Sequence, residues 1–290
     1  ALRHAAEHAN GRRLGELRAS VALENGIRDF ESHNVLARIP GSRHPEETIV
    51  YSSHWDHLGI HPEEEGDNIY NGAADNASGV AGLIALARLY AEGEAPERSI
   101  LLLAVTAEES GLLGSKWYTE HPVYPLATTV ANFNMDGIAV GATGPTRDIA
   151  VVGMGKSELE DYLAGAAEAM ERELVEEPYP EKGFYYRSDH FSFAKAGVPA
   201  LFLTRGTDSI AHGSGYGRQK LEAYIADHYH RPSDEYSADW DLGRAAEEVT
   251  LLYLTGRQLA DSRAFPQWRE GVEFRAIREQ TRQQRTAAAP

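Results

Sequence analysis

Acidic and imidazole side chains follow the short apolar runs of this sequence, in a pattern that suits metal binding. Residues 48–51 form the first run, and His54 and Asp56 come soon after it. Residues two apart in an extended chain point the same way, so these two side chains can share one side. A metal-bound imidazole commonly donates its other N–H to a carboxylate, and Asp56 could accept that bond from His54. Taken alone, the pair also fits an ordinary buried histidine.

Asp75 lies in a stretch of small residues directly before an apolar segment. The stretch reads Asn71-Gly-Ala-Ala-Asp75-Asn76-Ala77-Ser78-Gly79. Ser78 or Asn76 could cap the helix that follows, which accounts for one polar residue but not for all of them. Small neighbours would give the Asp75 carboxylate room to hold a cation close to the backbone. Asp75 is therefore a candidate metal ligand.

Two adjacent glutamates follow the most hydrophobic run, residues 99–106, in the segment Ala107-Glu108-Glu109-Ser110-Gly111. Adjacent side chains diverge, which suits two different tasks. One carboxylate can bind a metal while the other takes a proton from metal-bound water, because a divalent cation lowers the pKa of that water. The alternative is a pair of glutamates in the first turn of a helix, where the helix dipole favours them.

Two further segments complete the set of candidates. Asp136 follows the next apolar run, and residues 227–234 supply His230 and Tyr229. Two histidines, two aspartates and one glutamate can serve two adjacent metal ions if one carboxylate bridges them, and these ligands suit zinc, with cobalt or manganese as substitutes. Two ions about 3.5–4 Å apart are the arrangement found in aminopeptidases and phosphatases. The predicted reaction class is hydrolysis.

The elements that must position these residues alternate between strands and helices. The pattern predicts strands at residues 48–51, 99–106, 129–134, 149–152 and 200–204, and helices at 79–92, 112–120, 157–173 and 241–261. Such alternation is typical of a three-layer α/β sandwich, in which helices cover both faces of a mostly parallel central sheet. Ligands of such sheets bind beyond the carboxyl ends of the strands, where the candidate residues lie.

Residues 1–262 are expected to form a single catalytic domain. Residues 1–40 read as an irregular lead-in, in which residues 21–39 predict two extended segments around an Asn-Gly hairpin signal. The segments 176–183 and 205–217 are rich in Pro and Gly and predict long loops. Residues 263–290 read as a polar C-terminal tail, a surface helix followed by disorder.

The composition excludes several classes of function. The net charge is −16, which argues against a protein that binds nucleic acid or anionic membranes. Cysteine is absent, so thiolate catalysis and cysteine-based zinc sites are excluded, and a metal must be held by His, Asp and Glu. No apolar run approaches the roughly 20 residues that a membrane span needs.

The motifs, taken in order, resemble those of the co-catalytic di-zinc exopeptidases, a family that includes bacterial secreted aminopeptidases and glutamate carboxypeptidases. The matching motifs are His54-x-Asp56, Asp75-Asn-Ala-Ser-Gly79, Glu108-Glu109-Ser-Gly, Asn-Met-Asp136 and Tyr229-His230-Arg-Pro-x-Asp234. The resemblance implies the zinc-dependent exopeptidase fold, two zinc ions, a peptide substrate, and a secreted or periplasmic location.

The resemblance also implies a role for each matched residue. The implied metal ligands are the bridging Asp75, with His54 and Asp136 for one ion, and Glu109 and His230 for the other. Glu108 would be the general base for attack by a metal-bound hydroxide on the peptide carbonyl. Asp56 would orient His54, and Tyr229 would help to stabilise the oxyanion. The peptide bond between Asp75 and Asn76 would be cis.

The residues around the motifs leave open which end of a peptide is shortened. An aminopeptidase must hold a free ammonium, and acidic side chains that could do so are Glu63, Glu64, Glu65 and Asp67. A carboxypeptidase must hold a free carboxylate, and basic side chains that could do so are Lys182, Arg187, Arg205 and Arg218. From the resemblance we expect an aminopeptidase. The alternatives are a glutamate-carboxypeptidase-like enzyme and a catalytically silent binding domain.

Aromatic residues and further histidines surround the motifs without a fixed role. The aromatic residues could line a pocket for an apolar side chain or pack in the core, and they are Phe184, Tyr185, Tyr186, Phe191 and Tyr216. The histidines without a role are His57, His61, His190, His212 and His228. Of these, His190 is predicted either to line the substrate pocket or to follow a helix cap at Ser188 or Asp189.

Overall fold

The computed structural model describes residues 20–27 and 29–288, and the chain divides into two compact units, residues 1–31 and 32–290. The described residues of the first unit have no regular secondary structure, so the predicted hairpin is wrong there. The rest of the predicted lead-in, residues 1–19 and 28, lies outside the described residues. Val21 and Leu23 are 77% and 78% exposed, and an Asn-Gly turn forms a hairpin only when its arms bury a face.

The second unit is built on a seven-stranded sheet. The strands are β1 (Val35–Ile39), β2 (His44–His54), β5 (Arg98–Val105), β6 (Thr129–Asn134), β7 (Asp148–Val151), β8 (Glu173–Glu176) and β9 (Ala200–Arg205). Their order across the sheet is β1-β5-β2-β6-β9-β7-β8, and a separate two-stranded sheet pairs β3 (Gly59–Ile60) with β4 (Ile69–Tyr70). Strands β5, β2, β6 and β9 run parallel, whereas β1 pairs antiparallel with β5 and β7 with β9. The predicted mostly parallel sheet is confirmed.

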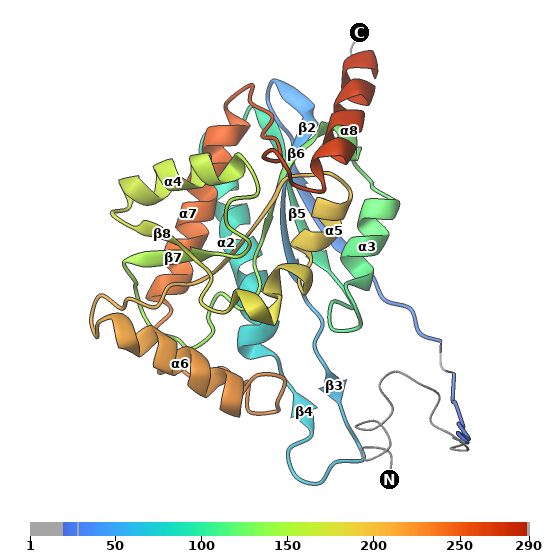
Figure 1. Ribbon diagram of the computed structural model, residues 1–290, viewed down its shortest axis with the longest axis vertical. Coiled ribbons are helices and arrows are strands. Elements are labelled where there is room, and N and C mark those ends of the chain that lie inside the picture. Colours follow the sequence, from blue (N-terminus) through green and yellow to red (C-terminus); the bar gives the residue numbers. More distant parts are fainter. Residues whose placement is uncertain (1–19, 28, 289–290) are drawn as a thin grey trace, which may run out of the picture. The chain divides into compact units, whose positions relative to one another are not determined.

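Helices cover both faces of this sheet, as predicted (Figure 1). The α-helices are α2 (Ser78–Glu92), α3 (Leu113–Glu120), α4 (Leu159–Ala169), α5 (His190–Lys195), α6 (Ser214–Asp227), α7 (Gly243–Ala260) and α8 (Arg275–Ala288). Short turns of helix are η1 (Ala73–Ala77), η2 (Leu126–Thr128), η3 (Pro180–Lys182) and η4 (Phe184–Tyr186). In Figure 1, α2, α4 and α7 lie on one side of the sheet, and α3 and α5 on the other. Contacts agree, since α2 and α4 both pack against α7, and α3 packs against α5.

The central strands form the core because both of their faces are apolar. Residues 49–51 of β2 are fully buried, and the neighbouring strand β5 is buried along nearly its whole length. Helix α2 places Leu83 and Leu86 on one buried stripe that faces the sheet. Gly79, in its first turn, permits close packing, because a Cβ there would overlap the hydroxyl of Ser53. The helix therefore starts directly against the end of β2.

Two segments differ from the sequence-based expectation. The predicted loop over residues 205–217 ends early, because α6 begins at Ser214; the glycines of its first turn obscure the helical pattern. The segment after residue 262, which reads as a polar tail, contributes to the core. Trp268 is 1% exposed and donates its Nε1–H to the carbonyl of Gly197. Helix α8 then follows, and residues 289–290 lie outside the described residues.

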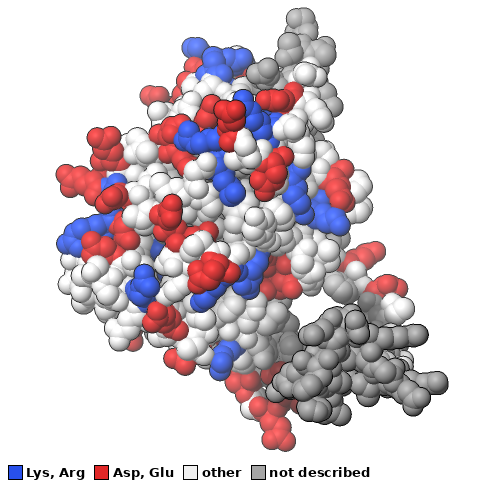
Figure 2. Space-filling view, in the orientation of Figure 1, with Lys and Arg blue, Asp and Glu red and all other residues white. Residues whose placement is uncertain are grey.

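On the face that Figure 2 shows, the coloured Lys and Arg side chains are interspersed with Asp and Glu and form no continuous basic area. Such a face offers no extended platform for a polyanion. Among the residues that the structure describes, no helix has both the length and the apolar character needed to cross a membrane.

Candidate active site

Three neighbouring parallel strands end at the candidate site. Strand β2 ends at His54, which lies beside Val105, the last residue of β5. Strand β6 lies on the other side of β2 and ends at Asn134. The residues that follow β5 and β6, Glu108-Glu109 and Asp136, therefore reach the same rim of the sheet as His54.

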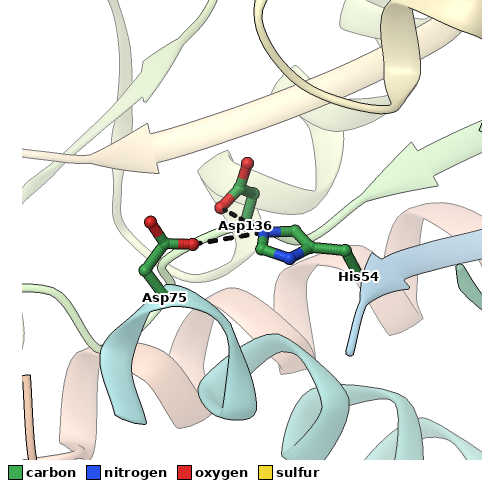
Figure 3. Close-up of side chains that lie close together, drawn as sticks. All are labelled: His54, Asp75 and Asp136. Carbon is green, nitrogen blue, oxygen red and sulfur yellow. Dashed lines mark hydrogen bonds and ion pairs between the residues drawn. The ribbon is translucent and has the colours of Figure 1, made fainter. Parts of the chain in front are cut away.

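The first cluster at this rim contains His54, Asp75 and Asp136 (Figure 3). The Nε2 atom of His54 lies 3.2 Å from Oδ1 of Asp75 and 3.4 Å from Oδ1 of Asp136. The Nδ1 atom of His54 lies 3.1 Å from the backbone carbonyl of Asp56, to which it can donate. That bond would leave the lone pair of Nε2 directed at the two carboxylates. The three side chains are close enough together to hold one metal ion.

The second cluster shares Asp75 with the first. The Nε2 atom of His230 lies 3.4 Å from Oδ2 of Asp75 and 3.1 Å from Oε2 of Glu109. A third imidazole, that of His57, lies with Nδ1 2.9 Å from Oε1 of Glu109. The two oxygens of Asp75 therefore face different clusters, the arrangement that a bridging carboxylate requires.

Buried polar atoms test whether these side chains fit a metal ion. Neither ring nitrogen of His57 has an aligned hydrogen bond, and Oε1 of Glu109 also lacks one within the described part of the chain. Buried polar groups without partners are costly and call for an explanation. His57, Asp75 and Glu109 lie close enough together to hold one metal ion, which would satisfy Oε1 of Glu109 and one ring nitrogen of His57. Imidazole with carboxylate is a donor set that zinc accepts. The side chains present therefore fit a metal ion.

When no metal is bound, ion pairs with the carboxylates keep the histidines of the two clusters protonated. Hydrogen bonds to Asp75 and Glu109 raise the pKa of His230 to about 10. Burial alone would lower the pKa of His54, but Asp136 and Asp75 outweigh it and raise that pKa well above its usual range. Burial likewise opposes ionisation of Asp75, yet His230 and His54 hold its pKa below the usual range. Metal binding at these ligands must therefore displace protons.

Glu108 lies outside both clusters. Its side chain is buried, and it has no ion pair with any described histidine. Burial, with the charge of Asp136 as the next cause, raises the pKa of Glu108 to about 9. When no metal is bound, this carboxyl group is therefore protonated at neutral pH, and the positive charge of a bound metal ion would favour the carboxylate form that a general base needs. Its neighbour Glu109 points into the second cluster, so the two adjacent side chains diverge as expected.

The carboxylate of Asp56 holds the backbone that carries both glutamates. It lies 3.8 Å from Nδ1 of His54, so the two groups face each other. Its oxygens also accept the backbone N–H groups of Glu108 at 3.1 Å and Glu109 at 3.3 Å. The sequence does not reveal this second contact, because it joins segments more than fifty residues apart.

Asn76 ties Asp75 to the ends of two strands. The peptide bond between Asp75 and Asn76 is cis, as the resemblance implies. The Nδ2 of Asn76 donates to Oγ of Ser53 and to the carbonyl of Met135, both at 3.0 Å. Its Oδ1 accepts the N–H of Gly137 at 3.1 Å. This amide side chain therefore fixes Asp75 relative to both β2 and β6.

Asp234 supports the same segment from the opposite direction. It is 1% exposed and accepts the backbone N–H groups of Ala74 and Asp75, each at 3.0 Å. It also accepts the hydroxyl of Tyr224 at 3.2 Å. Because Asp234 belongs to the loop that carries His230, one loop both supplies a candidate ligand and holds another.

A chain of buried hydrogen bonds orients Asp136. Ser188 donates to Oδ2 of Asp136 at 2.6 Å and accepts from Nδ2 of Asn134 at 2.8 Å. The amide oxygen of Asn134 accepts from Ser52 at 2.7 Å, and Ser52 accepts from Asn132 at 2.9 Å. With Oδ2 occupied in this way, Oδ1 of Asp136 is left to face His54. Sequence reasoning missed this chain, because polar residues inside a strand carry no signal of their partners.

A cavity of about 480 Å³ borders both clusters and Glu108. Of the predicted pocket aromatics, Phe184 and Tyr186 line it, whereas Tyr185 and Phe191 pack in an aromatic cluster beside it. Of the predicted basic residues, those that line it are Lys182, Arg187 and Arg205. The acidic residues Glu63, Glu64, Glu65 and Asp67 are not among its lining residues, nor are Arg218 and Tyr216.

Tyr229 lines this cavity and stacks on His230, with ring centroids 3.9 Å apart. The guanidinium of Arg187 donates to the phenol oxygen of Tyr229 at 3.2 Å. Burial raises the pKa of Tyr229 above its usual range, so the hydroxyl keeps its proton at neutral pH. Tyr229 therefore offers an O–H donor at the cavity wall.

Comparison with known proteins decides the family. Peptidase family M28 matches residues 34–254, most of the chain and all of the segments that build the two clusters. The chain belongs to Peptidase family M28. The resemblance drawn from the motifs is therefore confirmed, and with it the prediction of a metallopeptidase hydrolase.

Curated relatives of this M28 chain include proteins of different lengths and names. A vacuolar membrane protease of Schizosaccharomyces japonicus is 36% identical over 112 residues, which cover 39% of this chain and 12% of that protein. Leucine aminopeptidase 2 of Arthroderma otae is 27% identical over 292 residues, covering 89% of this chain and 52% of that protein. The chain thus spans about half or less of the length of these relatives.

Solved structures agree on the fold of the M28 chain. A zinc aminopeptidase from Bacillus subtilis superposes with a TM-score of 0.59 at 20% identity, covering 83% of this chain and 52% of that one. At this identity the likeness concerns the fold, and it confirms the predicted three-layer α/β architecture.

The predicted secreted or periplasmic location is wrong. Several fungal relatives of this M28 chain are named vacuolar membrane proteases, which does not fit that location. The prediction came from the family resemblance alone. Residues of a catalytic core are selected for folding and chemistry, so they carry no signal of the compartment in which the protein works.

His190 of the M28 chain lies behind the cavity wall rather than in it. It is fully buried, with ring centroids 5.0 Å from those of both Tyr185 and Phe202, and it is not among the lining residues. Burial lowers the pKa of His190 to about 3. Asp189 precedes α5 and makes no side-chain capping hydrogen bond to it.

His190 is expected to make the metal-free M28 chain less stable in acid. The unfolded chain protonates this residue near pH 6.5, whereas the folded chain does so only near pH 3, so its contribution is full above pH 6.5 and falls as the pH drops. Urea unfolding measures the free energy of unfolding at each pH. Between pH 7 and pH 4.5, this free energy should fall by about 2–3 kcal/mol less in His190→Phe than in the wild type. Equal losses in both proteins would contradict the neutral, buried imidazole.

Proposed function

We propose that this chain is the catalytic unit of a zinc aminopeptidase. Membership of Peptidase family M28 supports a peptide substrate. The name of Leucine aminopeptidase 2, which aligns with 89% of the chain, supports the amino-terminal preference. We assign the activity to the unit that begins at residue 32, because it contains every residue discussed below.

Two zinc ions are proposed as the cofactor, with cobalt or manganese as substitutes. We assign one ion to His54 and Asp136 and the other to Glu109 and His230, with Asp75 as the shared ligand. The two oxygens of Asp75 face the two clusters separately, which supports this division. When bound, zinc would polarise the scissile carbonyl and lower the pKa of water at the site.

The remaining steps rely on the side chains of the chain itself. We assign Glu108 as the general base, which takes a proton from the attacking water and returns it to the leaving amine. Its place in the cavity wall, outside both groups of candidate ligands, supports this role. Tyr229 is assigned to donate its O–H to the oxyanion, with Arg187 holding the phenol in place. Asp56 is assigned to orient His54 and the backbone of both glutamates.

The observation that carries the amino-terminal assignment is the grouping of carboxylates along one cavity. Asp136, Glu108 and Glu177 all line it together with the shared ligand Asp75. The oxygen atoms of these side chains could accept hydrogen bonds from a free α-ammonium group that enters the cavity. A peptide with a blocked amino terminus lacks these donors. We therefore expect cleavage of the first peptide bond.

A mixed peptide library tests this assignment directly. The zinc-loaded protein is incubated with the library, with and without a chelator, and mass spectrometry follows which terminus shortens. Loss of residues from the amino end, abolished by the chelator, is the expected result. Loss from the carboxyl end would replace the proposal with a glutamate-carboxypeptidase-like activity. Failure to shorten any peptide would favour a silent binding domain.

His57 is proposed to support the second cluster. Replacement by glutamine should weaken zinc binding at Glu109 and His230 by roughly 10–100-fold, because groups next to a metal ligand position it and tune its affinity. Competition with a fluorescent zinc chelator measures the affinity. His61→Gln is the matched control, since His61 packs against Tyr70 outside both clusters. Equal zinc affinity of the His57 and His61 variants would contradict this role.

A further inference from the structure

Arg205 is the basic residue in the cavity wall that lacks a partner. It ends strand β9, and it lines the cavity with Lys182 and Arg187. Lys182 lies over the ring of Tyr179 at 4.4 Å, and Arg187 donates to Tyr229. For the guanidinium of Arg205, no ion pair or side-chain hydrogen bond exists within residues 20–27 and 29–288, and its buried Nε is without an acceptor.

Two buried arginines of the described chain show how the protein holds a guanidinium away from water. Arg98 pairs with Glu47 at 2.6 Å and donates to two backbone carbonyls. Arg244 pairs with Glu248 at 2.5 Å and also donates to backbone carbonyls. A buried charge is tolerated when it is paired and hydrogen-bonded. The half-buried Arg205 has no such partner among the described residues, and it lines a cavity in which a small molecule could supply an acceptor.

The two carboxylates whose charges act most on Arg205 already bind other side chains. Glu248 is bound by Arg244, and Asp136 accepts from Ser188 and faces His54. Burial, with the neighbouring charge of Arg244, lowers the pKa of Arg205 to about 10, so the guanidinium is still cationic at neutral pH. A ligand in the cavity therefore meets a positive charge with free donors at the end of β9.

Glu177 is the cavity-wall carboxylate that belongs to neither cluster and is not the proposed general base, and it must be weighed against Arg205. Glu177 accepts the N–H of Gly153 at 3.1 Å with one oxygen, while the other has no partner within the described residues. Burial raises the pKa of Glu177, which favours its neutral form. Arg205 keeps its full charge and has more unused hydrogen-bonding capacity, so of these two side chains Arg205 is the stronger binding partner for a charged group.

We propose that Arg205 binds a carboxylate of the substrate, and that this carboxylate is the side chain of an amino-terminal glutamate or aspartate. The second half of the proposal rests on the aminopeptidase function proposed above. The guanidinium presents paired N–H donors, which match a carboxylate in a bidentate geometry. Leu221 and Ile225 also line the cavity and can contact the methylene groups of such a side chain.

The test compares single-residue substrates that differ in charge. The 4-nitroanilides of glutamate, glutamine, leucine and lysine carry no terminal carboxylate, so any dependence on charge comes from the side chain. For the zinc-loaded wild type we expect kcat/KM for the glutamate substrate to exceed that for the glutamine substrate at least tenfold. Arg205→Met should bring this ratio to about one, mainly through KM, and Arg205→Lys should restore part of it. Arg218→Met is the matched control, because Arg218 does not line the cavity, and it should keep the wild-type ratio.

A binding measurement separates this inference from the proposed function. Isothermal titration of free glutamate and free glutamine into each zinc-loaded protein needs no turnover. Tighter binding of glutamate by the wild type, lost in Arg205→Met, supports the inference even if no anilide is cleaved. Cleavage of the leucine substrate with equal ratios in wild type and Arg205→Met overturns the inference and leaves the aminopeptidase standing. A preference for the lysine substrate would assign the pocket to Glu177 and also overturn it.

Peptides distinguish the two possible sources of the carboxylate. N-acetylated dipeptides ending in glutamate offer a terminal carboxylate and no free ammonium. Suppose that Arg205→Met impairs cleavage of these peptides and leaves the ratio of kcat/KM between the glutamate and glutamine anilides unchanged. Arg205 then binds the carboxylate at the carboxyl terminus of the peptide. That result would overturn the assignment to an acidic amino-terminal side chain.

Discussion

Replacing Glu108 with glutamine is expected to lower kcat by roughly 10²–10⁴-fold while the zinc content stays that of the wild type. Glutamine has the shape of glutamate but cannot take up the proton of the attacking water. Glu108 lies in neither cluster, so its removal takes no ligand from a metal. Steady-state kinetics on a peptide substrate and elemental analysis by mass spectrometry provide the two readings.

Glu109→Gln is the matched comparison for this variant. Glu109 contacts both His230 and His57, so its loss should release zinc as well as reduce the rate. Both variants should be less active than the wild type, so zinc content and not activity distinguishes them. If Glu108→Gln released zinc and Glu109→Gln retained it, the roles assigned to the two glutamates would have to be exchanged.

Replacing Asp75 with asparagine should have the largest effect on metal content. The wild type is expected to retain two zinc ions per chain after dialysis against metal-free buffer. An amide offers only one oxygen where Asp75 directs one oxygen at His54 and the other at His230, so both sites should lose affinity. We expect Asp75→Asn to retain less than one ion per chain.

Asp136→Asn tests whether the two clusters are separate sites. Asp136 belongs to the cluster of His54 alone, so this variant should retain about one zinc ion per chain. Elemental analysis of the two variants in parallel gives the answer. Equal retention in Asp75→Asn and Asp136→Asn would argue against Asp75 as a shared ligand and against a two-ion site.

The rim of the sheet was predictable because strand order follows simple rules. Apolar runs at residues 48–51, 99–106 and 129–134 had to be buried strands, and each was followed by an acid or an imidazole. Parallel strands bring their carboxyl ends to one edge, so residues such as His54 and Asp136 could be placed together without a structure. The structure brings these candidates together at that edge.

Residues that act through distant partners were not predictable. His57 comes just after β2, and nothing in its spacing indicated that the chain turns it towards Glu109. The link from Asp56 to the backbone of Glu108 depends on how two loops meet. Arg205 was one of four candidate cations, and its lack of a partner is visible only once all its neighbours are placed. Sequence periodicity reports which face is buried and not which polar groups meet.

The hairpin predicted around Asn25-Gly26 and the loop predicted over residues 205–217 failed for related reasons. A turn signal favours a hairpin only if its arms have a surface to cover, and β1 found that surface on β5. Helix α6 has glycines in its first turn, which lower its intrinsic helix propensity. Burial of Leu221 and Tyr224 stabilises the helix despite this. In both cases tertiary packing overruled the local pattern.

The backbone N–H groups of Ala74 and Asp75 donate to Asp234, which joins two segments far apart in the sequence into one rigid unit. The segment of Asp75 and the loop of His230 cannot move independently without breaking buried bonds. The conformational entropy of these segments is therefore lost when the chain folds, and little of it remains to be lost when an ion arrives. Preorganisation of this kind would let a site made from segments far apart in the sequence bind a metal ion as tightly as a site on one rigid element.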